Sequence, residues 1–330
     1  MPNFGDSIVS VCIPVYNGED YIEETIRSVL SQTYQNFRLI ISDNCSTDNT
    51  KEIVLGFKDP RISYSRNEKN LGLVGNSNRC LELADGDYVY YIHHDDIMRP
   101  DNLERKVRIL DQHPSVGFVH SDVGLINQHG KHLGLTMFDA SQDYIKEGTT
   151  IFEQYILNMP IGASIFIGAV MARRECYVKV GKFNPKISDA FDSEMWMRLL
   201  LFFDVACIGE KLVDYRLHDQ MTSTALTDEN GLNIRGLKEH FATCSSVLYQ
   251  YKNYIHNHAV LKRKVASAFS MRAVTKGVGF LLKCDLSQAF SYAKLSIYFY
   301  PLVFFQKSFW YFFLTLLLGK FKSMFSAISS

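Results

Sequence analysis

The stretch Tyr88-Val-Tyr-Tyr-Ile-His-His-Asp-Asp-Ile-Met-Arg-Pro-Asp101 decides the fold of this chain. Its apolar run is rich in aromatic and β-branched residues and ends at two adjacent carboxylates, Asp95 and Asp96. This pattern is typical of a buried strand that delivers acids to the edge of a sheet, where open parallel sheets bind their ligands. Two acids at such an edge repel each other unless a cation lies nearby. A divalent metal that holds a nucleotide diphosphate would supply that cation.

Strands and helices alternate on both sides of this stretch, which indicates βαβ units. The fold class is therefore predicted to be α/β, with a Rossmann-like, mostly parallel central sheet flanked by helices. Residues 121–160 show only weak periodicity. Strands are predicted at 8–13, 37–42, 62–65, 88–93, 116–120, 165–173, 205–208 and 212–217, and helices at 22–30, 48–57, 76–83, 102–110 and 192–202.

The character of the chain changes after about residue 225, where long helical patterns begin. We expect an α/β domain over 1–225 and a helical C-terminal region over 226–330. The formal net charge is zero, but residues 251–330 contain eleven Lys or Arg and one acid, Asp285, so this segment is at +10 and the rest at −10. A basic segment of this kind suggests nucleic acid or an anionic membrane surface as a partner.

The seven cysteines lie far apart, which argues against a disulfide framework and against a zinc site. A reducing cytosol is the simplest location for such a chain. The N-terminal residues show neither an apolar core nor a cleavage pattern, so no signal peptide is predicted.

The turn after the first predicted strand reads Pro14-Val-Tyr-Asn-Gly18. A dinucleotide-binding unit would have G-x-G-x-x-G there, and a Walker P-loop is missing as well. A nucleotide bound at this sheet would therefore need a metal or basic side chains to hold its phosphates.

Several motifs occur in a fixed order: Val11-Cys-Ile-Pro-Val-Tyr-Asn-Gly18, Ser42-Asp-Asn-Cys-Ser-Thr-Asp48, Asn70-Leu-Gly72, Ala84-Asp-Gly-Asp-Tyr88 and His93-His-Asp-Asp96. Over residues 7–220 this order resembles glycosyltransferase family 2. The resemblance implies the GT-A fold, here with a C-terminal helical extension, and a nucleotide-diphosphate sugar, with UDP-sugars foremost, as the donor.

The resemblance also implies which residues hold the nucleotide. Pro14, Tyr16 and Asn17 would border the nucleobase, and Asp43 would accept a hydrogen bond from the N–H of the base. The alternative for Asp43 is a turn or helix cap, because Asp-Asn-x-Ser is favourable turn chemistry.

Asn76 and Asn78 would lie near the ribose or the diphosphate, unless they are simple helix-surface positions. Arg216 would neutralise the charge of the diphosphate.

The Asp-x-Asp metal motif of the family is altered here to His93-His94-Asp95. Its retained acid, Asp95, is the expected ligand of Mn²⁺ or Mg²⁺, and His93 and His94 would face the donor nucleotide. Imidazole suits softer ions than magnesium, so His93 is expected to meet a hydroxyl, or else only to cap the strand. Asp96 is either a second ligand or a cap, and His218 is expected at the metal or a phosphate.

The second constellation is Asp189-Ala-Phe-Asp-Ser-Glu-Met-Trp-Met-Arg198. In the family, an acidic pair precedes a Trp-x-Arg helix, and its second acid is the catalytic base. That position is Asp192, whereas Phe191 replaces the preceding Glu. Asp189 and Glu194 are rival bases, and a plain helix cap is the other interpretation. An acid that begins a helix has its pKa lowered by the helix dipole.

The resemblance therefore implies a metal-dependent inverting glycosyltransferase that acts on a hydroxyl of a glycan or lipid-linked glycan in surface-polysaccharide biosynthesis. One displacement inverts the anomeric carbon, and no second nucleophile for a retaining route is visible. The replacements at His93 and Phe191 keep open a catalytically weak sugar-nucleotide-binding or scaffold protein. A sugar nucleotidyltransferase would show a glycine-rich, basic loop after its first strand, which this chain lacks.

The segment Phe299–Phe325 is dense in aromatic residues and interrupted by lysines. Its apolar runs are shorter than the about 20 residues that span a bilayer. Aromatic residues beside lysines are typical of an interfacial helix, so we expect peripheral contact with the inner face of the cell membrane. Packing on the catalytic domain and an oligomer interface are the alternatives. Nucleic acid is not an expected partner, because the segment has no known recognition motif.

Overall fold

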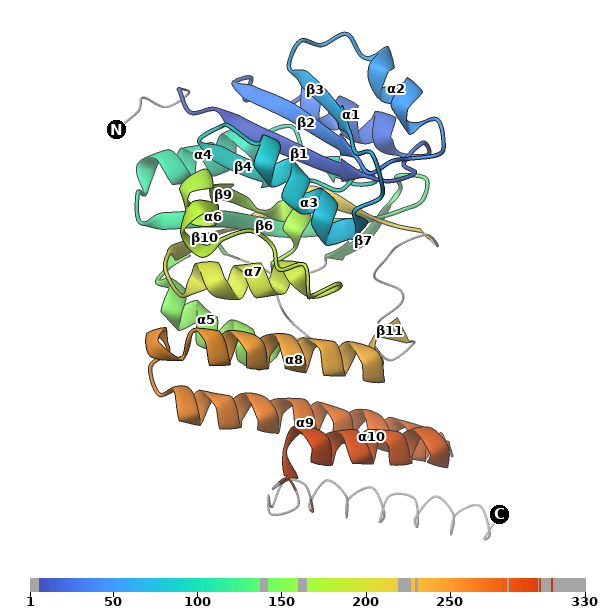
Figure 1. Ribbon diagram of the computed structural model, residues 1–330, viewed down its shortest axis with the longest axis vertical. Helices are drawn as coiled ribbons and strands as arrows, with labels where there is room; N and C mark the ends of the chain where they lie inside the picture. The colour runs from blue at the N-terminus through green and yellow to red at the C-terminus, as the bar shows by residue number, and fades with distance from the viewer. Residues whose placement is uncertain are drawn as a thin grey trace. The chain divides into compact units, whose positions relative to one another are not determined.

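The computed structural model describes residues 6–136, 142–159, 165–218, 227–228, 231–283, 285–301, 303 and 310. The chain forms two compact units, residues 1–222 and residues 223–330 (Figure 1). Each unit is described by itself below.

The first unit is built on a mixed β-sheet with the strand order β3-β2-β1-β4-β9-β6-β10-β5. Strands β3, β2, β1 and β4 pair in parallel, as β6 and β10 do, and the remaining pairs are antiparallel. The strands are β1 (Val9–Val15), β2 (Phe37–Asp43), β3 (Ile62–Arg66), β4 (Tyr88–Tyr91), β5 (Ile97–Met98), β6 (Val116–Asn127), β7 (His132–Thr136), β8 (Tyr144–Lys146), β9 (Met171–Arg173) and β10 (Asp204–Leu217).

Helices follow the strands and cover the sheet, as the alternating pattern predicted (Figure 1). The β1 strand is buried along its whole length, which agrees with its unbroken apolar sequence. The helices of this unit are α1 (Ile22–Leu30), α2 (Thr50–Gly56), α3 (Gly72–Leu83), α4 (Asn102–Gln112), α5 (Gly148–Asn158), α6 (Arg174–Val180) and α7 (Phe191–Leu200).

The second half of the sheet differs from the sequence prediction in two places. The predicted strand 165–173 is a short 3₁₀ turn, Ile167–Ala169, followed by β9, which lies antiparallel between β4 and β6. The predicted strands 205–208 and 212–217 are one strand, β10, whose register against β6 shifts between Ile208 and Val213. Gly209-Glu-Lys211 broke the apolar pattern there without ending the strand.

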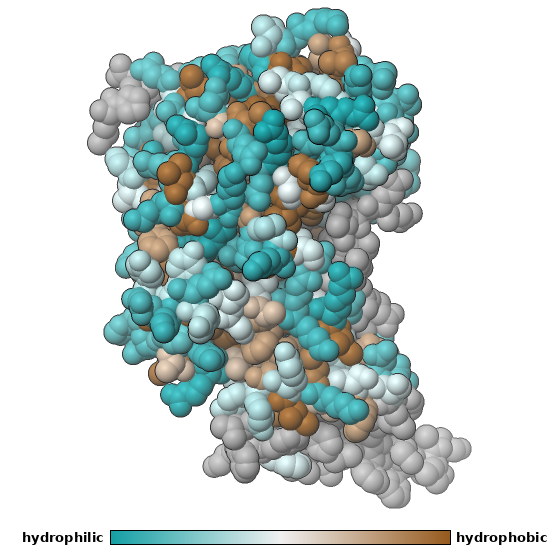
Figure 2. Space-filling view, in the orientation of Figure 1, coloured by the Kyte–Doolittle hydropathy of each residue, from teal (hydrophilic) through white to brown (hydrophobic). Residues whose placement is uncertain are grey.

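Among its described residues, the second unit has three long helices, α8 (Ile234–Gln250), α9 (His258–Leu282) and α10 (Leu286–Phe299), and a small pairing of β11 (Thr227–Asp228) with β12 (Gly231–Leu232). The α9 and α10 helices form a hairpin, within which the buried Ser270 hydroxyl donates to the Ser296 carbonyl at 2.9 Å. Apolar residues lie among hydrophilic ones on the visible surface of this unit (Figure 2), and Phe290 and Tyr298 are well exposed. Most of the aromatic segment 299–325 lies outside the described residues.

Candidate functional site

The acidic stretch after β4, which we define as His93-His-Asp-Asp96, brings together three side chains that can bind a cation. The strand ends at Tyr91, and one ligand atom from each of His93, Asp95 and Asp96 lies within 4.8 Å of the others. Asp96 is fully buried, and its Oδ2 accepts no hydrogen bond from any described residue, although His93 Nδ1 lies 3.5 Å away. A buried carboxylate oxygen without a donor is costly unless a cation or a proton satisfies it.

The end of β10 approaches the same stretch from the other side. The His218 Nε2 atom lies 2.9 Å from Asp95 Oδ2. The backbone N–H of Arg216 donates to Asp96 Oδ1 at 3.1 Å. His218, predicted at the metal or a phosphate, therefore contacts the acid predicted to bind the metal.

Arg216, which is predicted to neutralise the charge of the diphosphate, makes several contacts within the protein. Its side chain is 1% exposed, and its guanidinium donates to the Asp95 carbonyl at 2.8 Å, to the Gln128 carbonyl at 3.3 Å and to Glu24 Oε2 at 2.5 Å. The guanidinium also lies over the Tyr21 ring, 4.8 Å from its centroid. We interpret Arg216 as a residue that holds the acidic stretch in place, and its contact with the diphosphate stays a prediction.

Burial and neighbouring charges shift the pKa values of the acids and histidines in this cluster. Burial opposes ionisation of Asp95, but His94, His93 and His218 outweigh it and lower the Asp95 pKa. Burial raises the pKa of Asp96 to about 6, and the neighbouring Asp95 charge adds to this. Burial also lowers the pKa of His94. The donor set therefore suits a divalent cation, which would favour both carboxylates in their ionised forms.

Asp192 stands at the start of α7, where its Oδ1 accepts the backbone N–H of Ser193 at 2.6 Å. The predicted lowering of its pKa by the helix dipole is wrong in net direction, because burial raises the pKa of Asp192 to about 6. Its charge acts on His93: burial works against protonation of that imidazole, but Asp96, Asp95 and Asp192 together raise its pKa. The charge of Asp192 therefore acts on one member of the cation-binding cluster, His93.

The two rival bases near Asp192, Glu194 and Asp189, have different surroundings. Glu194 is buried and its Oε2 accepts from Arg198 Nη2 at 2.8 Å, so its carboxylate is already bound within α7. Asp189 is partly exposed and accepts the Ser188 hydroxyl at 2.7 Å. Phe191, which replaces the first acid of the family pair, packs edge to face on Phe183 with ring centroids 5.3 Å apart.

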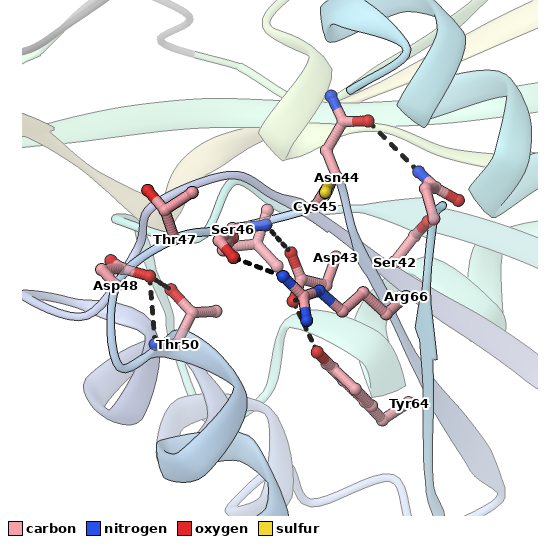
Figure 3. Close-up of polar contacts among 12 residues, drawn as sticks. Ser42, Asp43, Asn44, Cys45, Ser46, Thr47, Asp48, Thr50, Tyr64 and Arg66 are labelled. Atoms are coloured by element: carbon pink, nitrogen blue, oxygen red, sulfur yellow. Dashed lines mark hydrogen bonds and ion pairs between the residues drawn. The ribbon is translucent and has the colours of Figure 1, made fainter. Parts of the chain in front are cut away.

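Figure 3 shows Asp43 at the end of β2 with its carboxylate enclosed by donors. Its Oδ1 accepts the backbone N–H of Ser46 at 2.8 Å, and its Oδ2 accepts the Tyr64 hydroxyl at 2.5 Å. The half-exposed Arg66 places its Nε 3.6 Å from the same oxygen. The turn that the sequence offered as the alternative is therefore formed, and the contact with a base remains a prediction.

The loop after β1 lies beside this carboxylate. Asn17 has a left-handed φ of 51°, and its side-chain oxygen accepts the backbone N–H of Thr47 at 2.9 Å. Tyr16 is 45% exposed and offers a ring face, whereas Pro14 is buried within β1. A Cβ on Gly18 would come within 2.7 Å of the His94 ring, so only glycine allows His94 to pack against this loop.

The two asparagines of α3 form hydrogen bonds to neighbouring segments and are not simple helix-surface positions. The buried Asn76 amide donates to the Ser42 carbonyl at 2.8 Å, and its oxygen accepts the Ser42 hydroxyl at 2.8 Å. The Asn78 amide exchanges two hydrogen bonds of 2.9 Å with the backbone of Phe183. Their amides hold neighbouring segments together, and a position near the ribose or the diphosphate stays a prediction.

Sequence reasoning missed several residues that support the site. Tyr64 and Arg66 alternate along β3 toward Asp43, and their period of two was a usable signal. Glu24 and Thr25 on α1 contact the acidic stretch or its partner Arg216. Their spacing gave no such signal, because Thr25 lies 69 positions from His94 and Glu24 lies 192 positions from Arg216.

The motif residues belong to a known family. The family model described as glycosyl transferase family 2 matches residues 10–174. The chain is 32% identical to the "putative teichuronic acid biosynthesis glycosyltransferase TuaG" of Bacillus subtilis, over 66% of this chain and 82% of that protein. A UDP-Glc:α-D-GlcNAc-diphosphoundecaprenol β-1,3-glucosyltransferase of Escherichia coli is 36% identical over 38% of this chain and 49% of its own length.

Solved structures agree with the fold. The complex of Staphylococcus aureus TarS, residues 1–349, with UDP-GlcNAc superposes with a TM-score of 0.64 at 19% identity, covering 88% of this chain and 81% of that one. At this identity the similarity establishes the GT-A fold, as the resemblance predicted. The family model covers half of the chain and TuaG is related over most of its length, so this chain belongs to glycosyltransferase family 2.

Proposed function

We propose that this glycosyltransferase moves a sugar from a UDP-sugar to a hydroxyl of a glycan or lipid-linked glycan, with inversion of the anomeric carbon. The observation that carries the proposal is the His93–Asp95–Asp96 cluster after β4, in a chain of glycosyltransferase family 2; the candidate base, Asp192, is near enough for its charge to help raise the pKa of His93. An inverting transferase needs both a base for the acceptor and a cationic site for the leaving group, facing one substrate.

In the proposed step, the acceptor oxygen forms a bond to the anomeric carbon while the bond from that carbon to the diphosphate oxygen breaks. Asp192 takes the proton of the acceptor hydroxyl, and the diphosphate departs with the electron pair. Asp192 suits this role because its raised pKa makes it a stronger base than an exposed carboxylate. Its hydrogen bond from the Ser193 N–H fixes one oxygen.

Asp95, Asp96 and His218 would hold Mn²⁺ or Mg²⁺, with His93 turned toward the ribose. Such a cation supplies charge stabilisation for the leaving diphosphate. Asp95 accepts from His218, and Arg216 fixes the backbone between the two acids. These contacts keep the carboxylates oriented before the donor binds.

The UDP part of the donor would lie along the carboxyl ends of β1 and β2. Tyr16 offers a ring face for the base, Asn17 shapes the loop, and Asp43 receives the N–H of the base. The Asp43 carboxylate is fully buried but next to the half-exposed Arg66, whose displacement would open it to a ligand. UDP and UDP-GlcNAc are the ligands of two Staphylococcus aureus TarS complexes that share the fold.

A role in surface-polysaccharide biosynthesis is supported by the relatives, of which one is named for a lipid-linked acceptor. None of the described helices combines enough length and apolarity to span a bilayer. We propose that the basic helical unit instead lies against the inner face of the cell membrane. That position would bring the active site to acceptors carried on lipids.

The test is a panel of nucleotide sugars, assayed for transfer and for donor hydrolysis with and without Mn²⁺. We expect a UDP-sugar to be consumed only with the metal, and Asp192→Asn to lower turnover by about 10²–10⁴-fold without weakening UDP binding. Tight UDP binding without any turnover, unchanged by Asp192→Asn, would instead support the sugar-nucleotide-binding scaffold. Turnover by Asp192→Asn at the parent rate would overturn Asp192 as the base.

A further inference from the structure

Side-chain contacts reach several consecutive backbone carbonyls of the acidic stretch. The Thr25 hydroxyl lies 2.9 Å from the His94 carbonyl and 2.9 Å from the Asp96 carbonyl. The carbonyl between them, that of Asp95, accepts from Arg216 Nε at 2.8 Å. Three consecutive carbonyl oxygens are therefore fixed by two side chains.

Polar residues on the buried face of α1 and in the turn after it bind the backbone that follows β4. Thr25, Ser28 and Gln32 are all buried; Thr25 binds the acidic stretch itself, whereas Ser28 and Gln32, which lies just beyond the end of α1, bind the residues after it. The Ser28 hydroxyl accepts the Met98 N–H at 3.1 Å. Gln32 donates to the Arg99 carbonyl at 2.7 Å. An apolar helix face would have left these backbone groups buried without partners.

Glu24, on the neighbouring position of α1, acts on the stretch through Arg216. Its Oε2 accepts from Arg216 Nη2 at 2.5 Å, while the same guanidinium holds the Asp95 carbonyl. Glu24 is half exposed, whereas Arg216 is 1% exposed. The Tyr21 ring completes the enclosure, lying 5.0 Å from the His218 ring.

We propose that Thr25 and Glu24 are positioning residues, which set the geometry of the Asp95–Asp96–His218 cation site without touching the cation. This inference rests on the proposed function, because it assumes that the cluster binds the metal. A shift of the His94 to Asp96 backbone moves both carboxylates at once, so partners outside the ligand set control affinity.

The test measures Mn²⁺ affinity by calorimetric titration in the presence of saturating UDP, beside the thermal unfolding temperature of each variant. Thr25→Val removes the hydroxyl at constant shape, and Glu24→Gln removes the charge that holds Arg216. We expect each to weaken Mn²⁺ binding by about tenfold or more. Thr25→Ser, which keeps the hydroxyl, is expected to retain the parent affinity.

Two matched controls separate positioning from stability. Ser28→Ala removes a hydroxyl one turn along α1 that binds Met98 and not the acidic stretch. Glu23→Gln removes an equally exposed acid whose partner is Arg27, 2.6 Å away. Both controls should keep the parent Mn²⁺ affinity, although Ser28→Ala should lower the unfolding temperature.

Parent-like Mn²⁺ binding by Glu24→Gln and by folded Thr25→Val would overturn the inference, as would equal losses in the control variants. If Thr25→Val does not fold, Glu24→Gln decides, because Glu24 is half exposed and can be changed without emptying the interior. Asp95→Asn separates the two levels of the proposal. If that variant binds Mn²⁺ like the parent, the proposed metal site itself is wrong, and the role of Thr25 falls with it.

Discussion

His218 Nε2 lies 2.9 Å from Asp95 Oδ2, although the two residues are 123 positions apart. The contact follows from strand pairing: β10 runs antiparallel to β5, with Asp214 opposite Ile97. Residues that continue β10 therefore run back along the acidic stretch that precedes β5. The pairing brings Arg216 to Asp96 and His218 to Asp95.

His218→Ala should weaken Mn²⁺ binding by about 10–100-fold, whether His218 binds the metal or only orients Asp95. The reason is that the imidazole, directly after the end of β10, lies 2.9 Å from the Asp95 carboxylate. Calorimetric titration of Mn²⁺ in the presence of UDP measures the change. His132→Ala, which changes an exposed histidine on β7, is the control, and equal affinities for the two variants would contradict the prediction.

The pH dependence of kcat/KM should show an acidic limb governed by Asp192. Burial raises its pKa to about 6, and only the ionised carboxylate can accept the proton of the acceptor. Activity is therefore expected to be half-maximal near pH 6, to reach its plateau about one pH unit higher, and to fall about tenfold for each pH unit well below pH 6.

A second group, Asp96, also has a pKa of about 6, so the limb needs an assignment. The residual activity of Asp192→Asn, measured over the same pH range with saturating Mn²⁺, provides it. If Asp192 is the base, this variant loses the acidic limb. A limb that persists unchanged in Asp192→Asn would assign the titration to another group.

Tyr64→Phe should alter nucleotide binding through Asp43. The Tyr64 hydroxyl donates to Asp43 Oδ2, the oxygen nearest Arg66, and so competes with any base for that acceptor (Figure 3). Removing the hydroxyl frees the acceptor, and we expect tighter UDP binding, by a factor of about ten for one hydrogen bond. Asp43→Asn should weaken UDP binding. Fluorescence titration measures both, and unchanged UDP affinity in the two variants would rule out a base contact at Asp43.

The strands and helices of the first half of the sheet could be predicted from sequence because their signals are local. The apolar run of β1 and the periodic helix α1 need no distant partner to be recognised. β9 could not be predicted, since its three residues become a strand only by pairing on both sides with β4 and β6.

The site was predictable at the level of residue type, but the side-chain contacts were not. The acids Asp95 and Asp192 stood at element ends, where ligand sites occur. The side chains of Arg216, Asn76 and Asn78 form hydrogen bonds with backbone groups tens of residues away or more, so these contacts could not be predicted from local sequence. The direction of the Asp192 pKa was also mistaken, because a helix start is visible in the sequence and burial is not.

Binding to anionic vesicles should depend on the exposed basic run Lys262-Arg-Lys264 at the start of α9. Each such cation near a membrane surface contributes about 1 kcal/mol, so reversing all three to Glu should reduce binding at least about 100-fold. Sedimentation with vesicles containing phosphatidylserine measures it. The same charge change at the exposed Lys51, Lys58 and Lys69 of the first unit is the control, and equal loss in both variants would refute a specific membrane surface.

Glu194→Ala should lower the stability of the folded enzyme much more than it lowers the rate of the chemical step. Glu194 and Arg198 form a buried ion pair at 2.8 Å, and the guanidinium also donates to the carbonyls of Val180 and Lys182. Removing the acid leaves a buried cation, which costs about 3–5 kcal/mol of stability. Glu194→Gln keeps an acceptor for Arg198, so it should lose less stability and retain most of its turnover. Denaturant unfolding and single-turnover assays measure the two effects, and a stably folded but inactive Glu194→Gln would make Glu194, not Asp192, the base.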